Sequence, residues 1–190
     1  VKAYRLALEV YTREALPQDW AMTQNNLAVA LSDQAGASEG AERARLAAEA
    51  VQVCRASMKV LPSSPELSTM LGQLLGQQTW FQLLAGIDSL QCGQEAVTLL
   101  DDNGPSPEWM NYAHALLYGG RYPEAEAIYR KYLGQAFADG RKWNDELRND
   151  VAALRAAGRD HPDLKKVEAM LESAGAGLAV SKPDGAASPR

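Results

Sequence analysis

The feature that most restricts the fold of this sequence is the spacing of large and small residues in the segment 109–132. After the tryptophan that opens the segment, Tyr112 and Ala113 follow at helical intervals, and Ala125 and Tyr129 repeat the pattern beyond a Gly-Gly turn. Residues three and four apart share one face of a helix. Small residues let two helices approach closely, and large ones fill the gaps beside them. One such helix pair cannot bury its whole apolar face, so the spacing predicts that similar pairs stack on it.

The rest of the chain also favours helices, because good helix formers dominate and no run of alternating β-branched residues is present. Pro17 is expected to end the first helix, and Asp19 to cap the second. Ser64 and Ser106, each followed by proline, are typical helix starts. We expect helices at about 1–15, 20–34, 42–60, 65–85, 88–100, 107–119, 123–134, 143–157 and 162–172.

These residues carry a resemblance to a known family. Trp109, Tyr112-Ala113 and Leu116, followed by Ala125 and Tyr129, resemble the two-helix signature of the tetratricopeptide repeat family. A second match begins at Asn26-Leu27-Ala28 and continues from Ala50 to Pro62, with an inter-helix turn about ten residues longer than the family pattern. The segment 65–100 fits only the first half of the signature. The segment 23–29 also resembles the repeats of kinesin light chains and of many large bacterial multidomain proteins. The region from about 79 through 171 resembles a C-terminal repeat region of bacterial multidomain proteins.

The resemblance implies an all-α fold, an α-solenoid of stacked antiparallel helix pairs closed by C-terminal capping helices. Such a cap is needed because the last apolar face of a solenoid would otherwise meet water. The stretch after Glu172 is rich in Gly, Ala, Ser and Pro, which is typical of a flexible tail. The expected divisions are a partial repeat at 1–17, repeats at 19–62, 64–103 and 106–134, capping helices at 135–172 and a tail at 173–190.

In this family the first helix of each pair lines a concave groove that binds a peptide or a partner helix. The resemblance implies that an asparagine just before the signature Leu or Tyr bonds the ligand backbone, and Asn26 and Asn111 match that position. These amides could instead bind turns of their own array, and His114 could be a helix-packing residue. The candidate peptide-binding residues are Asn26, Asn111, Met22, Val29, Met110, His114, Leu117 and Tyr118.

Charge narrows the choice of ligand. The expected groove segments 20–34 and 107–118 contain no Lys or Arg, whereas family members that grip acidic peptide tails place a basic cluster there. A neutral or mixed peptide, or a partner helix laid into an apolar groove, is therefore favoured. The leading hypothesis is a protein-protein interaction scaffold. The alternative is a structural spacer that self-associates through its N-terminal face.

Composition disfavours other classes of function. The net charge of -5 and the scattered Lys and Arg argue against a nucleic-acid binder, and no apolar run approaches the ~20 residues of a membrane helix. No phosphate loop, nucleophile elbow or zinc-ligand spacing is present, so an enzyme, a metal and a cofactor are not expected. Cys54 and Cys92 fit reduced thiols in a cytoplasmic protein. Because the sequence opens with Val1 inside a helical pattern, we expect a fragment, and the resemblance implies that it belongs to a larger bacterial-type protein.

Overall fold

The computed structural model describes residues 1–61, 64–100 and 103–179, and within these ranges every regular element is a helix. The fold is therefore all-α, as the sequence predicts; a lone bridge between Ala136 and Lys142 is the sole β-type pairing in the described ranges. The helices are α1 (Lys2–Val10), α2 (Pro17–Gly36), α3 (Gly40–Met58), α4 (Pro65–Ala85), α5 (Leu90–Thr98), α6 (Pro107–Tyr118), α7 (Tyr122–Tyr132), α8 (Trp143–Ala156) and α9 (Leu164–Ala179).

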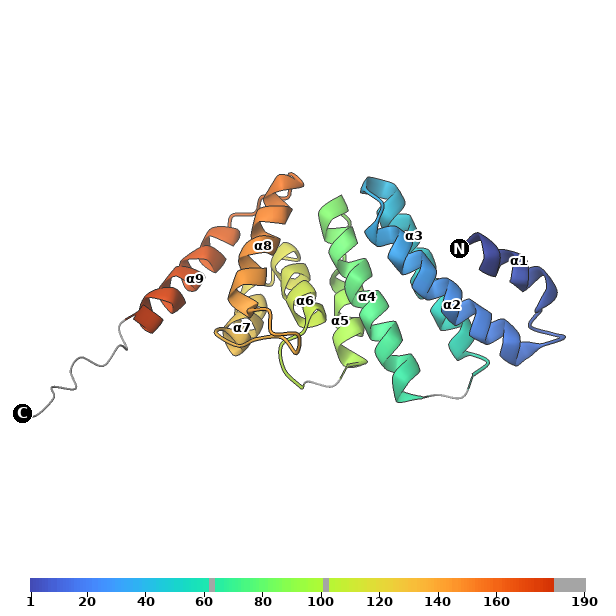
Figure 1. Ribbon diagram of the computed structural model, residues 1–190. Helices are drawn as coiled ribbons and strands as arrows, with labels where there is room; N and C mark the ends of the chain where they lie inside the picture. Colours follow the sequence, from blue (N-terminus) through green and yellow to red (C-terminus); the bar gives the residue numbers. More distant parts are fainter. Residues whose placement is uncertain (62–63, 101–102, 180–190) are drawn as a thin grey trace, which may run out of the picture.

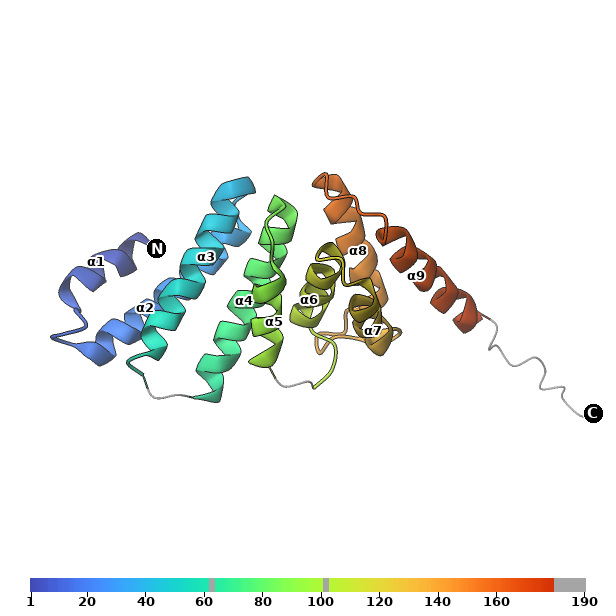
Figure 2. The ribbon, with the colours of Figure 1, turned by 180° about the vertical axis from the view of Figure 1, so that it is seen from behind.

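The helices follow one another along an elongated row in chain order (Figure 1). α2 and α4 lie in front of α3 and α5 in that view, and the order is reversed when the molecule is seen from behind (Figure 2). Each helix packs mainly on its neighbours in the chain, and α4 and α5 both contact α6. No single central core gathers all the helices.

Two clusters of buried side chains hold the row together. The aliphatic core lies between α2, α3, α4 and α5, and the aromatic core lies between α6 and α9. The aliphatic core is Leu27, Ala28, Leu31, Ala35, Leu46, Ala47, Ala50, Val51, Cys54, Leu71, Leu74, Leu75, Phe81 and Ala96. The aromatic core is Met110, Ala113, Leu116, Leu117, Ala125, Tyr129, Tyr132, Phe137, Trp143, Leu147, Val151, Leu164, Val167, Met170 and Leu171.

Glycines on α4 and α5 bring helix backbones close together. A Cβ on Gly72 would stand 2.9 Å from Leu100 Cγ and 3.2 Å from the backbone oxygen of Ala96. A Cβ on Gly93 would stand 3.3 Å from the Cα of Tyr112 on α6. Since ordinary contacts need more room than this, any side chain at these positions would push α5 away from α4 or α6.

The N-terminal end differs from the prediction. α1 ends at Val10, not near residue 15, and none of its side chains is buried. Pro17 does not close that helix: it is the first residue of α2, a position where the missing N–H costs nothing. Asp19 therefore lies within the first turn of α2 and does not cap it.

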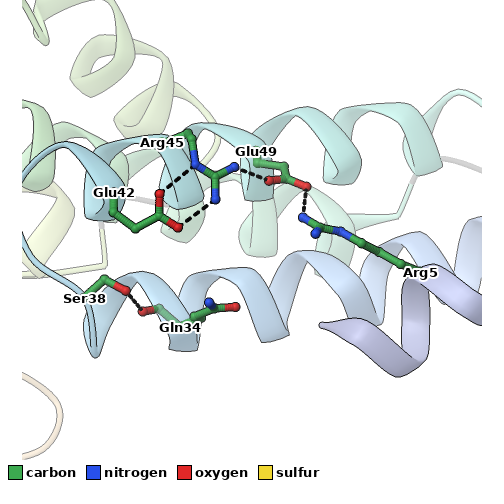
Figure 3. Close-up of polar contacts among 6 residues, drawn as sticks. All are labelled: Arg5, Gln34, Ser38, Glu42, Arg45 and Glu49. Atoms are coloured by element: carbon green, nitrogen blue, oxygen red, sulfur yellow. Dashed lines mark hydrogen bonds and ion pairs between the residues drawn. The ribbon is translucent and has the colours of Figure 1, made fainter.

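One ion pair joins α1 to α3, and two more extend it within α3. The Arg5 guanidinium donates to Glu49 at 2.6 Å, and Glu49 also accepts from Arg45 at 3.1 Å (Figure 3). Arg45 in turn donates to Glu42 within α3 at 2.7 Å, and this contact lowers the pKa of the Glu42 carboxyl. The network is exposed, so its net contribution to stability is small.

The helix starts at Pro65 and Pro107 are confirmed. Ser64 accepts a hydrogen bond from the backbone N–H of Leu67 at 3.2 Å, and Ser106 accepts one from that of Trp109 at 3.4 Å. At the other end of the chain, α9 continues to Ala179, so residues 173–179 are helical and not part of a tail. The remainder of the predicted tail, 180–190, lies outside the described residues.

Candidate binding groove

A groove of about 490 Å³ runs across α2, α4 and α6. No residue of α3, α5 or α7 lines it. α4 supplies most of the lining, and α2 and α6 form its two sides. The lining residues are Val29, Ser32, Met70, Gln73, Leu74, Gln77, Trp80, Phe81, Pro107, Glu108 and Asn111.

The floor of the groove is apolar. Leu74 and Phe81 are buried and belong to the aliphatic core, so the floor is continuous with the interior. Met70 and Trp80 are half-buried, and Val29 is 46% exposed at the rim. An apolar surface of this kind favours a ligand that brings its own apolar side chains.

Amide groups stand along the walls. Ser32 Oγ donates to the Gln77 side chain and links α2 to α4. Asn111 Nδ2 donates to the backbone oxygen of Gly76 at 3.1 Å and links α6 to α4. Within the described residues the Asn111 Oδ1 atom takes part in no hydrogen bond, so it can accept one from a peptide N–H.

Gly76 explains how α6 comes so near to α4. A Cβ at this position would stand 2.5 Å from the Cγ of Glu108 and 3.4 Å from its Cα. Because the glycine leaves this space open, the methylene groups of Glu108 lie directly on the α4 backbone. The Glu108 carboxylate is thereby held at the lip of the groove, which it helps to line.

Two predicted site residues, Val29 and Asn111, lie in the groove. Met22 and Asn26 lie outside its lining, on the same helix as Val29, and both are exposed. Met22 precedes Asn26 by four residues, and Asn26 precedes Val29 by three, so the three side chains form one exposed stripe along α2 that leads to the rim.

Three predicted site residues are wrong as groove residues. Met110, His114 and Leu117 are 2%, 0% and 0% exposed, so none of them can touch a ligand in the groove. The reason is that α6 is contacted by α4, α5 and α7, which leaves free only the narrow face that carries Asn111. The alternative reading of His114 as a packing residue is the one that fits.

His114 joins three helices through its ring nitrogens. Nδ1 lies 2.8 Å from the Tyr129 hydroxyl on α7, and Nε2 lies 3.3 Å from Asp150 Oδ2 on α8. Burial raises the pKa of Tyr129 well above its usual value, so the phenol stays protonated. A fully buried histidine with a neutral phenol beside it can hold helices in place.

Tyr118 lies outside the groove as well. Its hydroxyl donates to the backbone oxygen of Arg159, in the loop after α8, and the Arg159 guanidinium stands 5.4 Å from the Tyr118 ring centroid. The same guanidinium lies against Gly86, at the end of α4, where a Cβ would be 2.9 Å from Nη1. Tyr118 and Arg159 therefore connect the end of α4 to the end of α8.

Sequence reasoning missed the residues of α4. Gln73, Gln77 and Trp80 lie in the groove, and their spacing of four and three residues is the signal that would have found them. The segment 65–100 lacks the aromatic and alanine markers of 109–132, so its contribution to a groove was not evident.

The described ranges also bear on whether the chain has a metal site, a reactive cysteine or a membrane helix. No group of three or more His, Cys, Asp or Glu is arranged there to hold a metal ion. Both cysteines are free, and burial raises the pKa of the Cys54 thiol to about 11, which suppresses its thiolate. None of the described helices is long and apolar enough to cross a membrane.

Comparison with known proteins gives no relative. No protein-family model, curated protein or solved structure matches this chain.

Proposed function

We propose that this chain is a tetratricopeptide-like α-solenoid that binds a peptide or a partner helix in the groove formed by α2, α4 and α6. In this proposal α2–α3, α4–α5 and α6–α7 are successive antiparallel pairs, and α8 and α9 close the array. The observation that carries the proposal is the lining of the groove, which comes from the first helix of each pair and from none of the second helices.

The groove has the chemical character that such a ligand needs. Its apolar floor can bury side chains of a ligand, while Gln73, Gln77 and Asn111 offer donors and acceptors to peptide units. Helix-in-groove recognition uses apolar anchors at helical spacing in the same way. No enzymatic activity is proposed, because His114 and Tyr129 are fully buried and Asp150 is the sole partly exposed member of their contact.

The test is selection of peptides from a random display library on the full chain, followed by binding measurements with a matched pair of variants. Val29→Arg changes an aliphatic residue at the rim, and Ile87→Arg changes an equally exposed aliphatic residue, 49% against 46%, in the loop after α4. The expected result is that the selected peptides bind Val29→Arg at least about tenfold more weakly, and Ile87→Arg unchanged. Equal binding to both variants, or no enriched peptide, would contradict the proposal.

A second function is favoured by one specific observation. Leu6 and Val10 on α1 are 53% and 69% exposed, which leaves an apolar face at the N-terminal end of the row. This is the surface that a structural spacer would use for self-association. The internal bond of Asn111 also fits that hypothesis, whereas the exposed Asn26 does not. Sedimentation equilibrium of the wild type and of Leu6→Ser/Val10→Ser separates the two functions, since only self-association predicts a mass that falls in the variant.

A further inference from the structure

Positive charge is absent from the three helices that line the groove. α2, α4 and α6 contain no Lys or Arg, although each contains at least one Asp or Glu. The neighbouring helices α3 and α7 carry Arg43, Arg45, Arg55, Arg130 and Lys131. The two sets of helices therefore differ in charge: α2, α4 and α6 carry only acidic groups, whereas α3 and α7 carry charges of both signs and α5 has a single Glu and no Lys or Arg.

The carboxylates of the two sets also differ in their partners. Every acidic side chain of α3, α5 and α7 is in an ion pair: Glu42 and Glu49 with Arg45, Glu95 with Arg55, Glu124 with Arg121, and Glu126 with Arg130. The acidic side chains of α2, α4 and α6 are Asp19, Asp33, Glu66 and Glu108. By contrast, none of these four is in an ion pair among the described residues.

Three of these carboxylates without an ion-pair partner lie in or next to the groove, and hydrogen bonds from its own backbone N–H and from Ser64 lower the pKa of one of them, Glu66. Glu108 lines it directly. Asp33 lies one helical turn beyond Val29 on α2, and Glu66 lies one turn before Met70 on α4, so each shares the face of a lining residue. Negative charge thus stands on all three helices, around a floor that is apolar.

The helix dipole does not account for the whole pattern. Glu66 and Glu108 are in the first turns of their helices, where a negative charge is favourable without any partner. Asp33, however, is in the last turn of α2, where the dipole opposes it. Glu124 is in the first turn of α7 and is paired nonetheless, so a first-turn position does not by itself leave a carboxylate free.

One cation, Arg43, contacts the floor residue Phe81, which lines a second cavity as well as the groove. The Arg43 guanidinium stands 5.2 Å from the Phe81 ring centroid, but Arg43 lines the space between α3, α4 and α8 and is not among the lining residues of the groove. Its Nε also donates to the backbone oxygen of Ser38 at 2.5 Å, which directs the side chain along α3. The groove keeps its negative character.

We propose that the ligand of this groove is a cationic amphipathic segment of a partner protein. Its apolar side chains pack on Val29, Met70 and Trp80, and its Lys or Arg side chains reach the carboxylates of Asp33, Glu66 and Glu108. The inference rests on the proposed function and narrows it, because charge complementarity selects among ligands that are equally apolar.

The test uses two synthetic helical peptides with identical leucines at i, i+4 spacing, one with lysines and one with glutamates at the remaining positions. Binding of each to the full chain is measured by fluorescence anisotropy at low and at high salt. We expect the lysine peptide to bind more than about tenfold more tightly than the glutamate peptide, and the difference to shrink at high salt.

Variants then locate the effect. Glu108→Gln should weaken binding of the lysine peptide about two- to fivefold, as for the loss of one partly exposed ion pair. The triple variant Asp33→Asn/Glu66→Gln/Glu108→Gln should weaken it about tenfold or more. Glu172→Gln, which removes an exposed carboxylate of α9 outside the groove, should leave binding unchanged. Circular dichroism confirms that each variant keeps its helicity.

The outcomes separate the two proposals. If the two peptides bind equally and Val29→Arg abolishes both, the groove binds peptides but the charge inference is wrong. If the lysine peptide binds Val29→Arg and the triple variant as tightly as it binds the wild type, the peptide is recognised elsewhere and both proposals are wrong. Loss of the lysine peptide in Val29→Arg and its graded weakening in the carboxylate variants support both.

Discussion

The aliphatic core and the aromatic core solve the same problem of stacking helices in different ways. The aliphatic core contains five alanines and a single aromatic ring, Phe81, and glycines beside it let the backbones of α4, α5 and α6 nearly touch. The aromatic core contains four aromatic rings that fill wider gaps, with Tyr132 and Phe137 at 4.9 and 5.6 Å from the Trp143 ring centroid. One region depends on the absence of side chains, and the other depends on their bulk.

This difference decides where a substitution does damage. A close contact between backbones tolerates no added atoms, whereas a ring-filled gap tolerates no removed ones. The groove lies over the aliphatic side, where Gly76 sets how closely α6 approaches α4. The following variants test the contrast, beginning with the largest expected effect.

Trp143→Ala should destabilise the chain most. The side chain is completely buried between α7, α8 and the 135–142 loop, and its removal leaves a large cavity. We expect a loss of about 3–5 kcal/mol in the free energy of unfolding, measured by urea titration. A loss below about 1 kcal/mol would mean that this part of the row collapses around the gap and does not depend on ring volume.

His114→Ala should come second, at about 2–4 kcal/mol. It leaves the Tyr129 hydroxyl buried without a partner and frees Asp150 from α6. Tyr129→Phe, which removes the partner and keeps the ring, is the control and should cost about 1 kcal/mol. If the two variants lose the same stability, the histidine contributes through its hydrogen bond to Tyr129 alone.

Gly72→Ala tests the aliphatic side. A methyl group there meets Leu100 and the backbone of α5, so we expect a loss of about 1–2 kcal/mol even though alanine favours helix. Gly36→Ala is the matched control, because a Cβ at Gly36 meets nothing within 4 Å, and it should gain about 0.4–1 kcal/mol. Thermal melts of both variants give the sign, and two gains would refute close packing at Gly72.

Arg155→Met should have the smallest effect. Arg155 pairs with Glu168 across α8 and α9 and lowers the pKa of that carboxyl, but both side chains are more than a third exposed. The expected loss of stability at pH 7 is small, because exposed ion pairs contribute little. Because the lowered pKa means that the charged form is favoured in the folded state, the loss should disappear as pH falls through the acid range, below about 4. A difference that persists at low pH would point to packing by the Arg155 stem.

The same contrast explains what could be predicted from the sequence. Aromatic residues at helical spacing are conspicuous, so the two helices of the segment 109–132 are predictable, while Gly72, Gly76 and Gly93 carry no such mark. Helix starts at Ser-Pro were predictable because the cap and the proline act locally. The end of α1 was not, since Pro17 can either close one helix or open the next.

The candidate site was predicted only in part, for a physical reason. Val29 and Asn111 were placed in the groove because helical spacing identifies a face. Met110, His114 and Leu117 were misplaced because spacing does not say how many neighbours surround that helix, and α6 has three. Exposure of a helix face is a property of the assembled row and is not encoded in the helix alone.

The contact of Arg159 with Gly86 and Tyr118 has a mechanical consequence. A row of stacked helices bends at the interfaces between its helices, and the contacts of Arg159 connect one edge of the segment between α4 and α8. Contacts of this kind raise the bending stiffness of the segment that they span and leave bending to the other interfaces. The joint between α3 and α4 lies outside that segment, but other contacts cross it: Ser32 donates to Gln77 between α2 and α4, and Arg55 pairs with Glu95 between α3 and α5. The wall formed by α2 is therefore fixed to α4 independently of Arg159.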